Sequence, residues 1–140
     1  CTPQGVMHLI RSKYSCLKGK KAVVIGRSLL VGIPTAHLLM QAHATVTVVH
    51  SFSKNIESLC QSADILVVAC GQPRFIQPRW IKSDALVVDV GIHHTSHGLV
   101  GDVDTTQDIS HLGFLSPVPG GVGPLTVAYL LANTVTASSK

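Results

Sequence analysis

The stretch Lys21-Ala-Val-Val-Ile-Gly26-Arg-Ser-Leu-Leu-Val-Gly32-Ile-Pro34 decides the fold of this 140-residue chain. It opens with an apolar, β-branched run of the kind found in strands that are buried on both faces. Gly26 then permits a sharp turn, and Gly32 permits close packing of the segment that follows. Pro34 suits the first turn of a helix, where no N–H donor is needed. The stretch therefore predicts a strand, a tight turn and a helix.

The same alternation continues along the chain. Further strands are expected at Thr45–Val49, Asp64–Ala69, Ala85–Val90 and Gly113–Leu115, and helices at Thr2–Ser12, Pro34–Gln41, Asn55–Ser62 and Pro124–Thr136, with one helical turn at Pro78–Ile81. Alternating apolar strands and helices imply a mainly parallel sheet with helices on both faces, connected by right-handed crossovers. The predicted fold class is therefore α/β, a Rossmann-type doubly wound sheet.

Three local features complete this prediction. Thr2 is expected to be the N-cap of the first helix, with Pro3 as its first helical residue. The segment Gly91–Ser110, rich in glycine, histidine and polar residues, is expected to be irregular. The packed face of the last helix is predicted from apolar residues at helical spacing: Leu125, Ala128, Tyr129, Ala132 and Val135.

Composition excludes several classes of protein. Hydrophobic residues make up 46% and charged residues 13%, with a mean hydropathy of +0.38, which is too apolar for a disordered chain. This excess predicts strands buried on both faces, or a surface that meets another domain or a ligand. No apolar run approaches the ~20 residues that cross a bilayer, so no membrane partner is expected. The net charge is +4, but the basic cluster between Arg11 and Lys21 has almost no interleaved aromatic residues, which favours a solvated surface over nucleic acid binding.

Cysteine and histidine usage gives no metal site. The four cysteines show no CxxC spacing, so neither a zinc site nor a disulfide framework is expected, and a reducing compartment is indicated. His93, His94, His97 and His111 crowd one region, but no carboxylate or cysteine pattern completes a set of ligands. These histidines are interpreted as exposed or satisfied by hydrogen bonds in the core.

The turn after the first strand is a candidate phosphate site. Ligands of doubly wound sheets bind outside the carboxyl ends of the strands. Here the spacing is Gly-x-Ser-x-x-x-Gly, from Gly26 through Ser28 to Gly32. Backbone N–H groups at the start of the next helix would face a phosphate, although Ser28 stands where a glycine would allow the closest approach of a pyrophosphate. An ordinary strand–turn–helix connection is the alternative.

The end of the second strand predicts which dinucleotide binds. NAD sites usually carry Asp or Glu here, which binds the ribose 2′-hydroxyl. In this chain the strand is followed by His50 and Ser51, without a carboxylate. A serine hydroxyl can donate to a 2′-phosphate, and Arg27 can reach the same group with two N–H donors, with Lys54 adding charge nearby. Arg27 with Ser51 therefore favours NADP, unless Arg27 is only a solvent-exposed residue.

The remaining strand ends continue this line. Gly71 follows the third strand and is expected next along the cofactor, whereas Cys70 is interpreted as a buried structural thiol. Asp89 is interpreted as an acceptor for loop amides, and Ile92 is expected near the nicotinamide. The segment Pro117-Val-Pro-Gly-Gly-Val-Gly-Pro124 predicts a stiff but sterically open loop, against whose backbone a planar ring can lie.

The order and spacing of these motifs resemble the cofactor domain of methylenetetrahydrofolate dehydrogenase/methenyltetrahydrofolate cyclohydrolase. The resemblance covers essentially all 140 residues and is most specific in the strings Gly26–Pro34 and Pro117–Pro124. It implies hydride transfer from 5,10-methylenetetrahydrofolate to NADP, followed by hydrolysis of the 5,10-methenyl product to 10-formyltetrahydrofolate. It implies cofactor-binding roles for Thr2, Gly26, Arg27, Ser28, His50, Ser51, Gly71, Ile92 and Thr126, and places Pro119, Gly120 and Gly121 near the folate.

The resemblance extends to only one of the family's two domains. Residues 1–140 are expected to form one NAD(P)-binding Rossmann domain. The catalytic lysine belongs to a preceding N-terminal domain, so no catalytic residue is assigned in this chain. The implied partners are tetrahydrofolate derivatives and that missing domain, in a homodimeric full-length enzyme of the cytoplasm or the mitochondrion. His93 departs from the family pattern, which commonly has asparagine after Gly-Ile.

Two other functions stay open. One is the cofactor lobe of another two-domain NADP dehydrogenase, such as a shikimate-type or glutamyl-tRNA-type reductase. The other is a non-catalytic module that senses a dinucleotide. The proline-glycine loop argues against the first, and dependence on folate would exclude the second.

Overall fold

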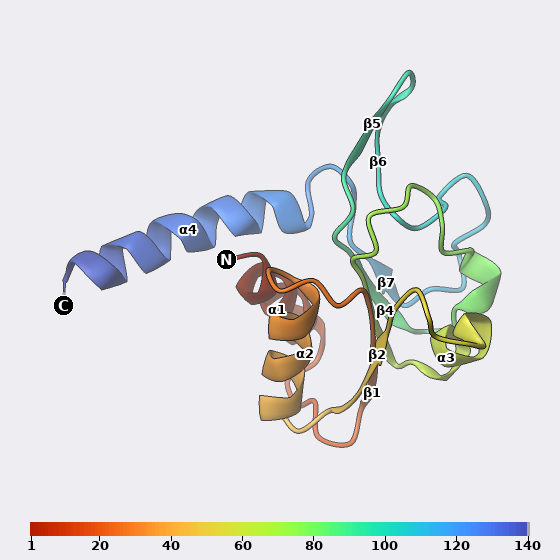
Figure 1. Cartoon of the computed structure of the whole chain (residues 1–140), viewed down its shortest axis with the longest axis horizontal. Helices are drawn as coiled ribbons and strands as arrows, with labels where there is room; N and C mark the ends of the chain where they lie inside the picture. The colour runs from red at the N-terminus through yellow and green to blue at the C-terminus, as the bar shows by residue number, and fades with distance from the viewer. Residues whose placement is uncertain (140) are drawn as a thin grey trace.

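A five-stranded sheet forms the centre of the computed structural model, which describes residues 1–139 (Figure 1). The strands are β1 (Lys21–Ile25), β2 (Thr45–Val49), β3 (Ile65–Val68), β4 (Leu86–Asp89) and β7 (Phe114–Leu115). They lie in the order β2-β1-β3-β4-β7, and all neighbouring pairs are parallel. Counted along the chain, this is the 2-1-3-4-5 order of a doubly wound sheet. The predicted α/β Rossmann-type fold class is confirmed.

Helices cover both faces of the sheet. They are α1 (Thr2–Lys13), α2 (Gly32–Gln41), α3 (Ile56–Ser62), the short 3-10 helix η1 (Pro78–Trp80) and α4 (Val122–Ser138). Figure 1 shows α1 and α2 on one side of the sheet and α3 on the other. The second face is completed by irregular chain, which includes a parallel bridge between Ile76 and Val103. The prediction of helices on both faces thus holds, but the two faces are covered unequally.

The central strands are buried on both faces because their side chains alternate between two cores. In β1, Val24 packs in one core with Ile10 and Leu39 from the helices α1 and α2. Val23 points the other way, into a core that contains Cys60 of α3. Full burial of one such side chain contributes about 1.5–3 kcal/mol, so the apolar runs themselves favour this layered arrangement. The edge strand β2 differs. Its apolar run predicts burial on both faces, but it is only partly buried, and Val48 is 37% exposed.

The first helix corrects one expectation. Cys1, not Thr2, occupies the N-cap of α1, and no side chain accepts a helix N–H there. Thr2 is already helical, and its hydroxyl is hydrogen-bonded to the hydroxyl of Thr126 in α4 (3.1 Å). A threonine hydroxyl that contacts another helix does not cap its own. Pro3 lies in the first turn, as expected.

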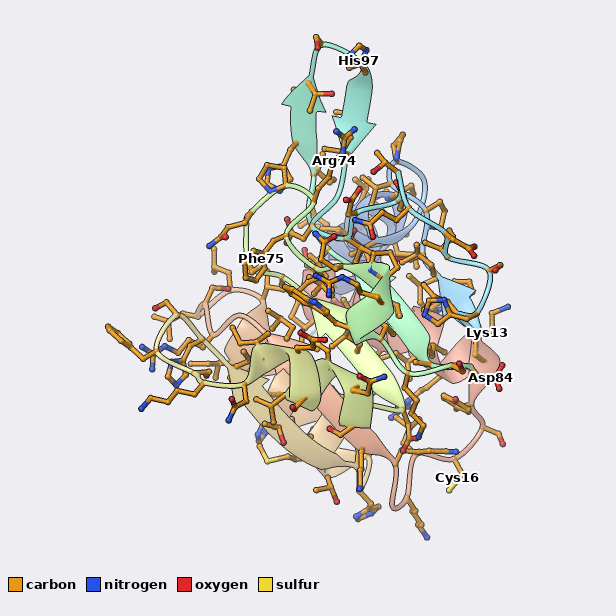
Figure 2. All side chains as sticks on the ribbon, turned by 90° about the vertical axis from the view of Figure 1, so that its right-hand side faces the viewer. Lys13, Cys16, Arg74, Phe75, Asp84 and His97 are labelled. Carbon is orange, nitrogen blue, oxygen red and sulfur yellow. The ribbon has the colours of Figure 1, made fainter. Side chains whose placement is uncertain are left out.

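A hairpin replaces part of the segment that was expected to be irregular. Strands β5 (His93–Thr95) and β6 (Gly98–Val100) pair antiparallel and project from the body, with His97 near the tip (Figure 2). The turn is closed by Thr95, whose hydroxyl accepts the N–H of His97 and donates to the carbonyl of Gly98. Gly98 has a φ of +108°, which an L side chain rarely adopts.

The last helix is longer than predicted and mostly exposed. It begins at Val122 rather than Pro124, and its C-terminal part extends away from the rest of the molecule (Figure 1). Of the predicted packed face, Leu125 and Tyr129 are half-buried, whereas Ala128, Ala132 and Val135 are exposed. The predicted packing is therefore wrong at Ala128, Ala132 and Val135. In residues 1–139, no helix combines the length and the apolarity that a transmembrane span requires.

Candidate functional site

The carboxyl ends of β1, β2 and β3 surround a cavity of about 420 Å³, a size typical of ligand pockets. Five of the predicted site residues line it: Gly26, Arg27, Ser28, His50 and Ser51. Cys70 and Gln72 form another part of the wall. Gly71 lies between those two, with a φ of +69°, but it is exposed and does not itself line the cavity. Apolar side chains, among them Ile56 and Phe75, complete the lining.

The floor of this cavity depends on the absence of side chains at two glycines. Gly26 has a φ of +117°, and its N–H donates to the carbonyl of Val49. A Cβ at Gly26 would lie 2.1 Å from the carbonyl oxygen of Ala69, and one at Gly32 would lie 2.3 Å from that of Gly26. Such distances are impossible for real atoms, so only glycine lets β1, β3 and α2 meet at this point. This is the crevice between β1 and β3 where the strand order reverses, the usual ligand site of such sheets.

Ser28 stands where the usual motif has its middle glycine, and its side chain has a structural role there. Its Oγ accepts the backbone N–H groups of Val31 (3.2 Å) and Gly32 (3.3 Å) at the start of α2. The N–H of Ile33 donates to the carbonyl of Ser28. The donors at the helix start, expected to face a phosphate, are therefore already satisfied within the protein.

The donors available to a phosphate lie earlier in the turn. Among residues 1–139, no acceptor is found for the backbone N–H groups of Ser28, Leu29 and Leu30. A turn with successive free N–H groups is an anion-binding arrangement. The cavity therefore fits a phosphate-containing ligand, with the loop, rather than the helix start, as the donor.

Arg27 and Ser51 lie at the same cavity from two adjacent loops. Both are exposed, and within residues 1–139 Arg27 forms no ion pair. The loop that carries Ser51 is held by His50, whose N–H donates to Ser53 Oγ (2.9 Å) and whose Nδ1 accepts the N–H of Phe52 (3.2 Å). Among the described residues, no carboxylate lines the cavity. A guanidinium and a hydroxyl without an acid suit an anionic group such as a 2′-phosphate, as the sequence predicts.

A second, smaller cavity lies beyond the end of β4. It has a volume of about 130 Å³ and is lined by Ile92 and by the proline-glycine loop, including Pro119, Gly120 and Gly121. Ile92 is 51% exposed. The structure thus joins the residue predicted near the nicotinamide with the three predicted near the substrate. Thr2 and Thr126 bond to each other, but neither lines this cavity.

Two buried carboxylates tie the strand ends together. Asp89 accepts N–H groups from Gly91 (2.9 Å), Asp102 (3.0 Å) and Val103 (2.9 Å), which confirms its interpretation as an acceptor for loop amides. Burial raises the pKa of the Asp89 carboxyl above its ordinary value. Asp102 is completely buried and accepts the N–H groups of Cys70 and Gly71 (3.0 Å each). Sequence analysis assigned no role to Asp102, because a carboxylate inside an irregular segment carries no periodic signal.

Cys70 lacks the lowered pKa of a catalytic cysteine. Burial raises the pKa of Cys70 to about 11, so its thiolate is scarce at neutral pH. Cys70 is half-buried at the cavity wall, and packs against the core beneath α3. Its interpretation as a structural thiol agrees with this pKa, but the thiol is half-buried rather than buried as expected.

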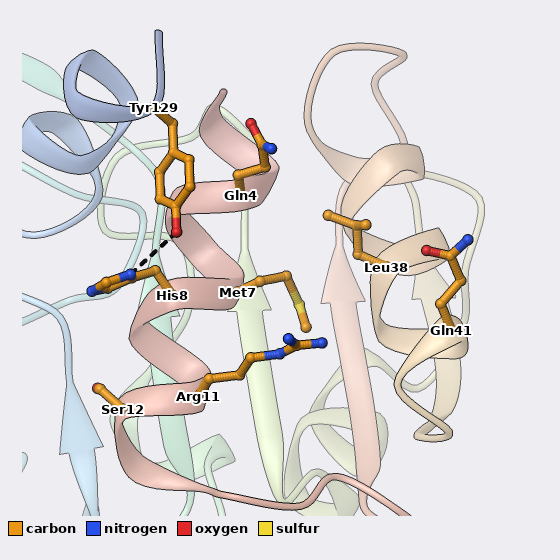
Figure 3. A pocket seen from close by; sticks show the side chains of 8 residues that line it. All are labelled: Gln4, Met7, His8, Arg11, Ser12, Leu38, Gln41 and Tyr129. Atoms are coloured by element: carbon orange, nitrogen blue, oxygen red, sulfur yellow. Dashed lines mark hydrogen bonds between the residues drawn. The ribbon is translucent and has the colours of Figure 1, made fainter. Parts of the chain in front are cut away.

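A larger cavity lies between the helices on one face of the sheet. It measures about 580 Å³ and is lined only by residues of the helices α1, α2 and α4, among them Arg11, Gln41 and Tyr129 (Figure 3). His8 Nδ1 and the Tyr129 hydroxyl are 3.2 Å apart across one side of it. It has no glycine turn and no strand end, so the 420 Å³ cavity at the carboxyl ends of the strands is the better candidate for a dinucleotide. Among residues 1–139, no three His, Cys, Asp or Glu side chains gather as metal ligands would.

Comparison with known proteins identifies the family. The family described as tetrahydrofolate dehydrogenase/cyclohydrolase, NAD(P)-binding domain, matches residues 1–140. The chain belongs to this family. Within it, the chain is 53% identical over 144 residues to the bifunctional protein FolD 2 of Pseudomonas savastanoi pv. phaseolicola, covering 100% of this chain and 48% of that protein. It is 50% identical to the bifunctional protein FolD of Wolbachia pipientis subsp. Culex pipiens, again covering 48% of the relative.

Solved structures of the tetrahydrofolate dehydrogenase/cyclohydrolase family share this fold. The bifunctional FolD enzyme of Campylobacter jejuni aligns with a TM-score of 0.94 and 43% identity, over 99% of this chain and 50% of that one. The enzyme of Trypanosoma brucei, solved with NADP cofactor and an inhibitor, aligns with a TM-score of 0.89 and 43% identity, over 97% and 49%. The chain therefore spans about half the length of the relatives that it matches.

Proposed function

We propose that this chain is the NADP-binding domain, over residues 1–140, of a bifunctional methylenetetrahydrofolate dehydrogenase/methenyltetrahydrofolate cyclohydrolase. The observation that carries the cofactor assignment is the pairing of Arg27 with Ser51 at one cavity whose lining contains no carboxylate. The free N–H groups after Gly26 add donors for the phosphates. Family membership supports a nicotinamide dinucleotide, and the T. brucei relative was solved with NADP.

The chemistry assigned to the full-length enzyme has two steps. A hydride would move from the methylene carbon of 5,10-methylenetetrahydrofolate to the nicotinamide, and water would then open the 5,10-methenyl product to 10-formyltetrahydrofolate. NADP supplies the hydride acceptor when it is bound. The residues of this chain would bind and orient it: the first cavity would hold the phosphate end, and the cavity at Ile92 and Gly120–Gly121 would hold the ring against the folate.

The proposed catalytic partner is the N-terminal half that the longer relatives possess. The exposed apolar side chains of α4 favour such a partner: Val127, Leu130, Leu131 and Val135 are each more than half exposed. Since this chain has no assigned catalytic residue, turnover is expected only when that half is supplied. We expect the full-length protein to be a homodimer in a reducing compartment, the cytoplasm or the mitochondrion; free thiols at all four cysteines are compatible with this.

The cofactor assignment is tested by Arg27→Ala. Loss of a charge-assisted hydrogen bond costs about 1.5–3 kcal/mol, so NADP affinity should fall roughly 10- to 100-fold while NAD affinity changes little. Dissociation constants from calorimetry measure both. Arg11→Ala is the matched control, because it removes the same charge from the α1 surface. Equal binding of NAD and NADP by the unmodified chain would refute the assignment.

The proposed enzymatic activity is tested by supplying the N-terminal half of a longer relative. Fusing this chain to the N-terminal half of the FolD 2 relative should yield NADPH from 5,10-methylenetetrahydrofolate, whereas the chain alone should give no turnover. Cyclohydrolase activity from the chain alone would contradict the proposal. A fusion that binds NADP without any folate-dependent turnover would favour a dinucleotide-sensing module instead.

A further inference from the structure

One contact near the site is not used by the cofactor assignment. His93 Nε2 lies 2.6 Å from Asp102 Oδ1, and because a carboxylate only accepts, the imidazole donates. The Asp102 side chain is fully buried, and that of His93 is 22% exposed. Hydrogen bonds to a buried carboxylate are among the strong ones in proteins. This contact therefore constrains both of the segments that it joins.

Those segments belong to the two halves of the candidate site. Asp102 binds the N–H groups of Cys70 and Gly71 through its other oxygen, at the wall of the larger cavity. His93 follows Ile92 directly and opens the hairpin, at the smaller cavity. The Asp102 carboxylate is therefore a bridge, and His93 is the side chain through which the Ile92 segment is attached to it.

Asp102 is also held in place by contacts other than the one with His93. The N–H of Asp102 donates to Asp89 Oδ1, and its carbonyl accepts the N–H of Ile76. A Cβ at Gly91 would lie 2.2 Å from Asp102 Oδ1, so the chain before Ile92 packs directly on the same carboxylate. Asp102 is thus fixed by backbone contacts that do not involve His93. Removing the imidazole should free the Ile92 segment without moving the carboxylate.

We propose that His93 is a positioning residue, which holds Ile92 and the start of the hairpin so that the smaller cavity is preformed for the nicotinamide ring. The proposal rests on the proposed function, since it assumes that NADP occupies both cavities. It assigns His93 no contact with the cofactor. The adenosine end, bound at Arg27 and Ser51, should not depend on it.

The experiment compares two probes of different length. NADP reaches both cavities, whereas 2′-phospho-ADP-ribose, which is NADP without the nicotinamide ring, reaches the first cavity with its phosphates. His93→Leu should weaken NADP roughly tenfold, as expected for the loss of a charge-assisted hydrogen bond, and change the affinity for 2′-phospho-ADP-ribose by less than about twofold. His93→Gln, which keeps an N–H donor at a similar reach, should restore most of the loss. His94→Leu, at the exposed neighbouring position, should change neither affinity.

A second readout does not need the cofactor. Amide hydrogen exchange at Gly91 and Ile92 should accelerate in His93→Leu and return toward the original rate in His93→Gln, while exchange within β3 stays unchanged. If His93→Leu lowers both affinities equally, or if His93→Gln fails to restore NADP binding, the positioning role is overturned. If the unmodified chain binds NADP no more tightly than 2′-phospho-ADP-ribose, the inference fails, and the assignment of the phosphate site stands. If it binds neither probe, the proposed function itself fails.

Discussion

Ser28 combines two tasks in the turn between β1 and α2. Its hydroxyl accepts the N–H groups of Val31 and Gly32, and its own N–H stays available to a ligand. A glycine at this position would leave the two helix donors without that acceptor. The replacement that weakens the sequence motif is thus an internal cap for α2.

Ser28→Ala should lower the free energy of unfolding by about 1 kcal/mol, the usual effect of losing a helix-capping hydroxyl. Urea denaturation measures this difference. Ser83→Ala is the control, because Ser83 is exposed and its hydroxyl forms no hydrogen bond within residues 1–139. Equal stability of the two variants would show that the capping contact contributes nothing.

Gly26→Ala should be far more harmful than Gly98→Ala, although both glycines have a strongly positive φ (+117° and +108°). The backbone strain of order 1–3 kcal/mol is shared by the two. Only at Gly26 would the new Cβ also collide with Ala69, because no atom lies within 4 Å of a Cβ at Gly98. Thermal unfolding should therefore show a modest loss for Gly98→Ala and a severe loss, or no folding, for Gly26→Ala. Similar melting temperatures would contradict the steric explanation.

At the scale of elements, the strands were the most predictable feature. Each apolar β-branched run became a strand within one or two residues of its expected bounds, because burial on both faces leaves a continuous signal. The hairpin β5–β6 was missed because most of its residues are polar or glycine, none of them is buried, and its turn is held by Thr95 rather than by a core. The outer part of α4 was mispredicted for the opposite reason: helical spacing of apolar residues indicates a packed face, but not whether the packing partner is in the same chain.

Asp64 links the N-terminal ends of three strands, through an ion pair with Lys82 before β4 and a hydrogen bond from the backbone of Lys21 in β1. Asp64 accepts Lys82 Nζ (2.5 Å) and the backbone N–H of Lys21 (2.9 Å), and these bonds hold the pKa of its carboxyl below the ordinary value of about 4. The unfolded chain therefore binds a proton more readily than the folded chain. The stabilisation from Asp64 is present above pH 4 and is lost as the pH falls through the lowered folded pKa.

Asp64→Asn should accordingly reduce stability at pH 7 by less than about 1 kcal/mol, as is usual for pairs near the surface, and should flatten the loss of stability on acidification below pH 4. Urea midpoints at pH 7 and in steps below pH 4 would measure this. Glu57→Gln is the control, because Glu57 forms no ion pair within residues 1–139. A parallel acid dependence of the original chain and Asp64→Asn would contradict the assignment.

The whole molecule has two cores and one uncovered helix. Both cores are made within the chain, one on each face of the sheet, and neither depends on the outer part of α4. The apolar excess in the composition thus has two sources: double-sided burial of β1, β3 and β4, and the exposed side chains of α4. Composition predicts both sources, but it does not give the share of the apolar residues that belongs to each.

We expect this chain, without a partner on α4, to self-associate at high concentration through the exposed apolar surface of that helix. Leu131→Lys should reduce this association, because Leu131 is 63% exposed. Sedimentation velocity over a tenfold range of concentrations would detect the change. Gln61→Lys adds the same charge to the exposed surface of α3 and should leave the association unchanged. Equal effects of both lysines would indicate a general charge effect instead of a contact through α4.

The site was predictable where glycine, basic or hydroxyl residues directly follow a strand. The structure brings Gly26, Arg27, Ser28, His50 and Ser51 to one cavity because parallel strands end at the same edge. The roles of these residues toward a ligand stay predictions. The Asp102 bridge and its contact with His93 could not be foreseen, since they depend on how an irregular segment returns to the sheet.

The contact between Gly26 and Ala69 has a kinetic consequence. β1 and β3 are parallel neighbours in the sheet, but α2, β2 and α3 separate them along the chain, so their ends meet across a large sequence separation. Pairings of such large sequence separation are slow to form, and until then the first turn has no floor against which a ligand can rest. A ligand that requires this floor binds the native state alone and cannot assist its formation. The cofactor should therefore slow the unfolding of this chain without accelerating its folding.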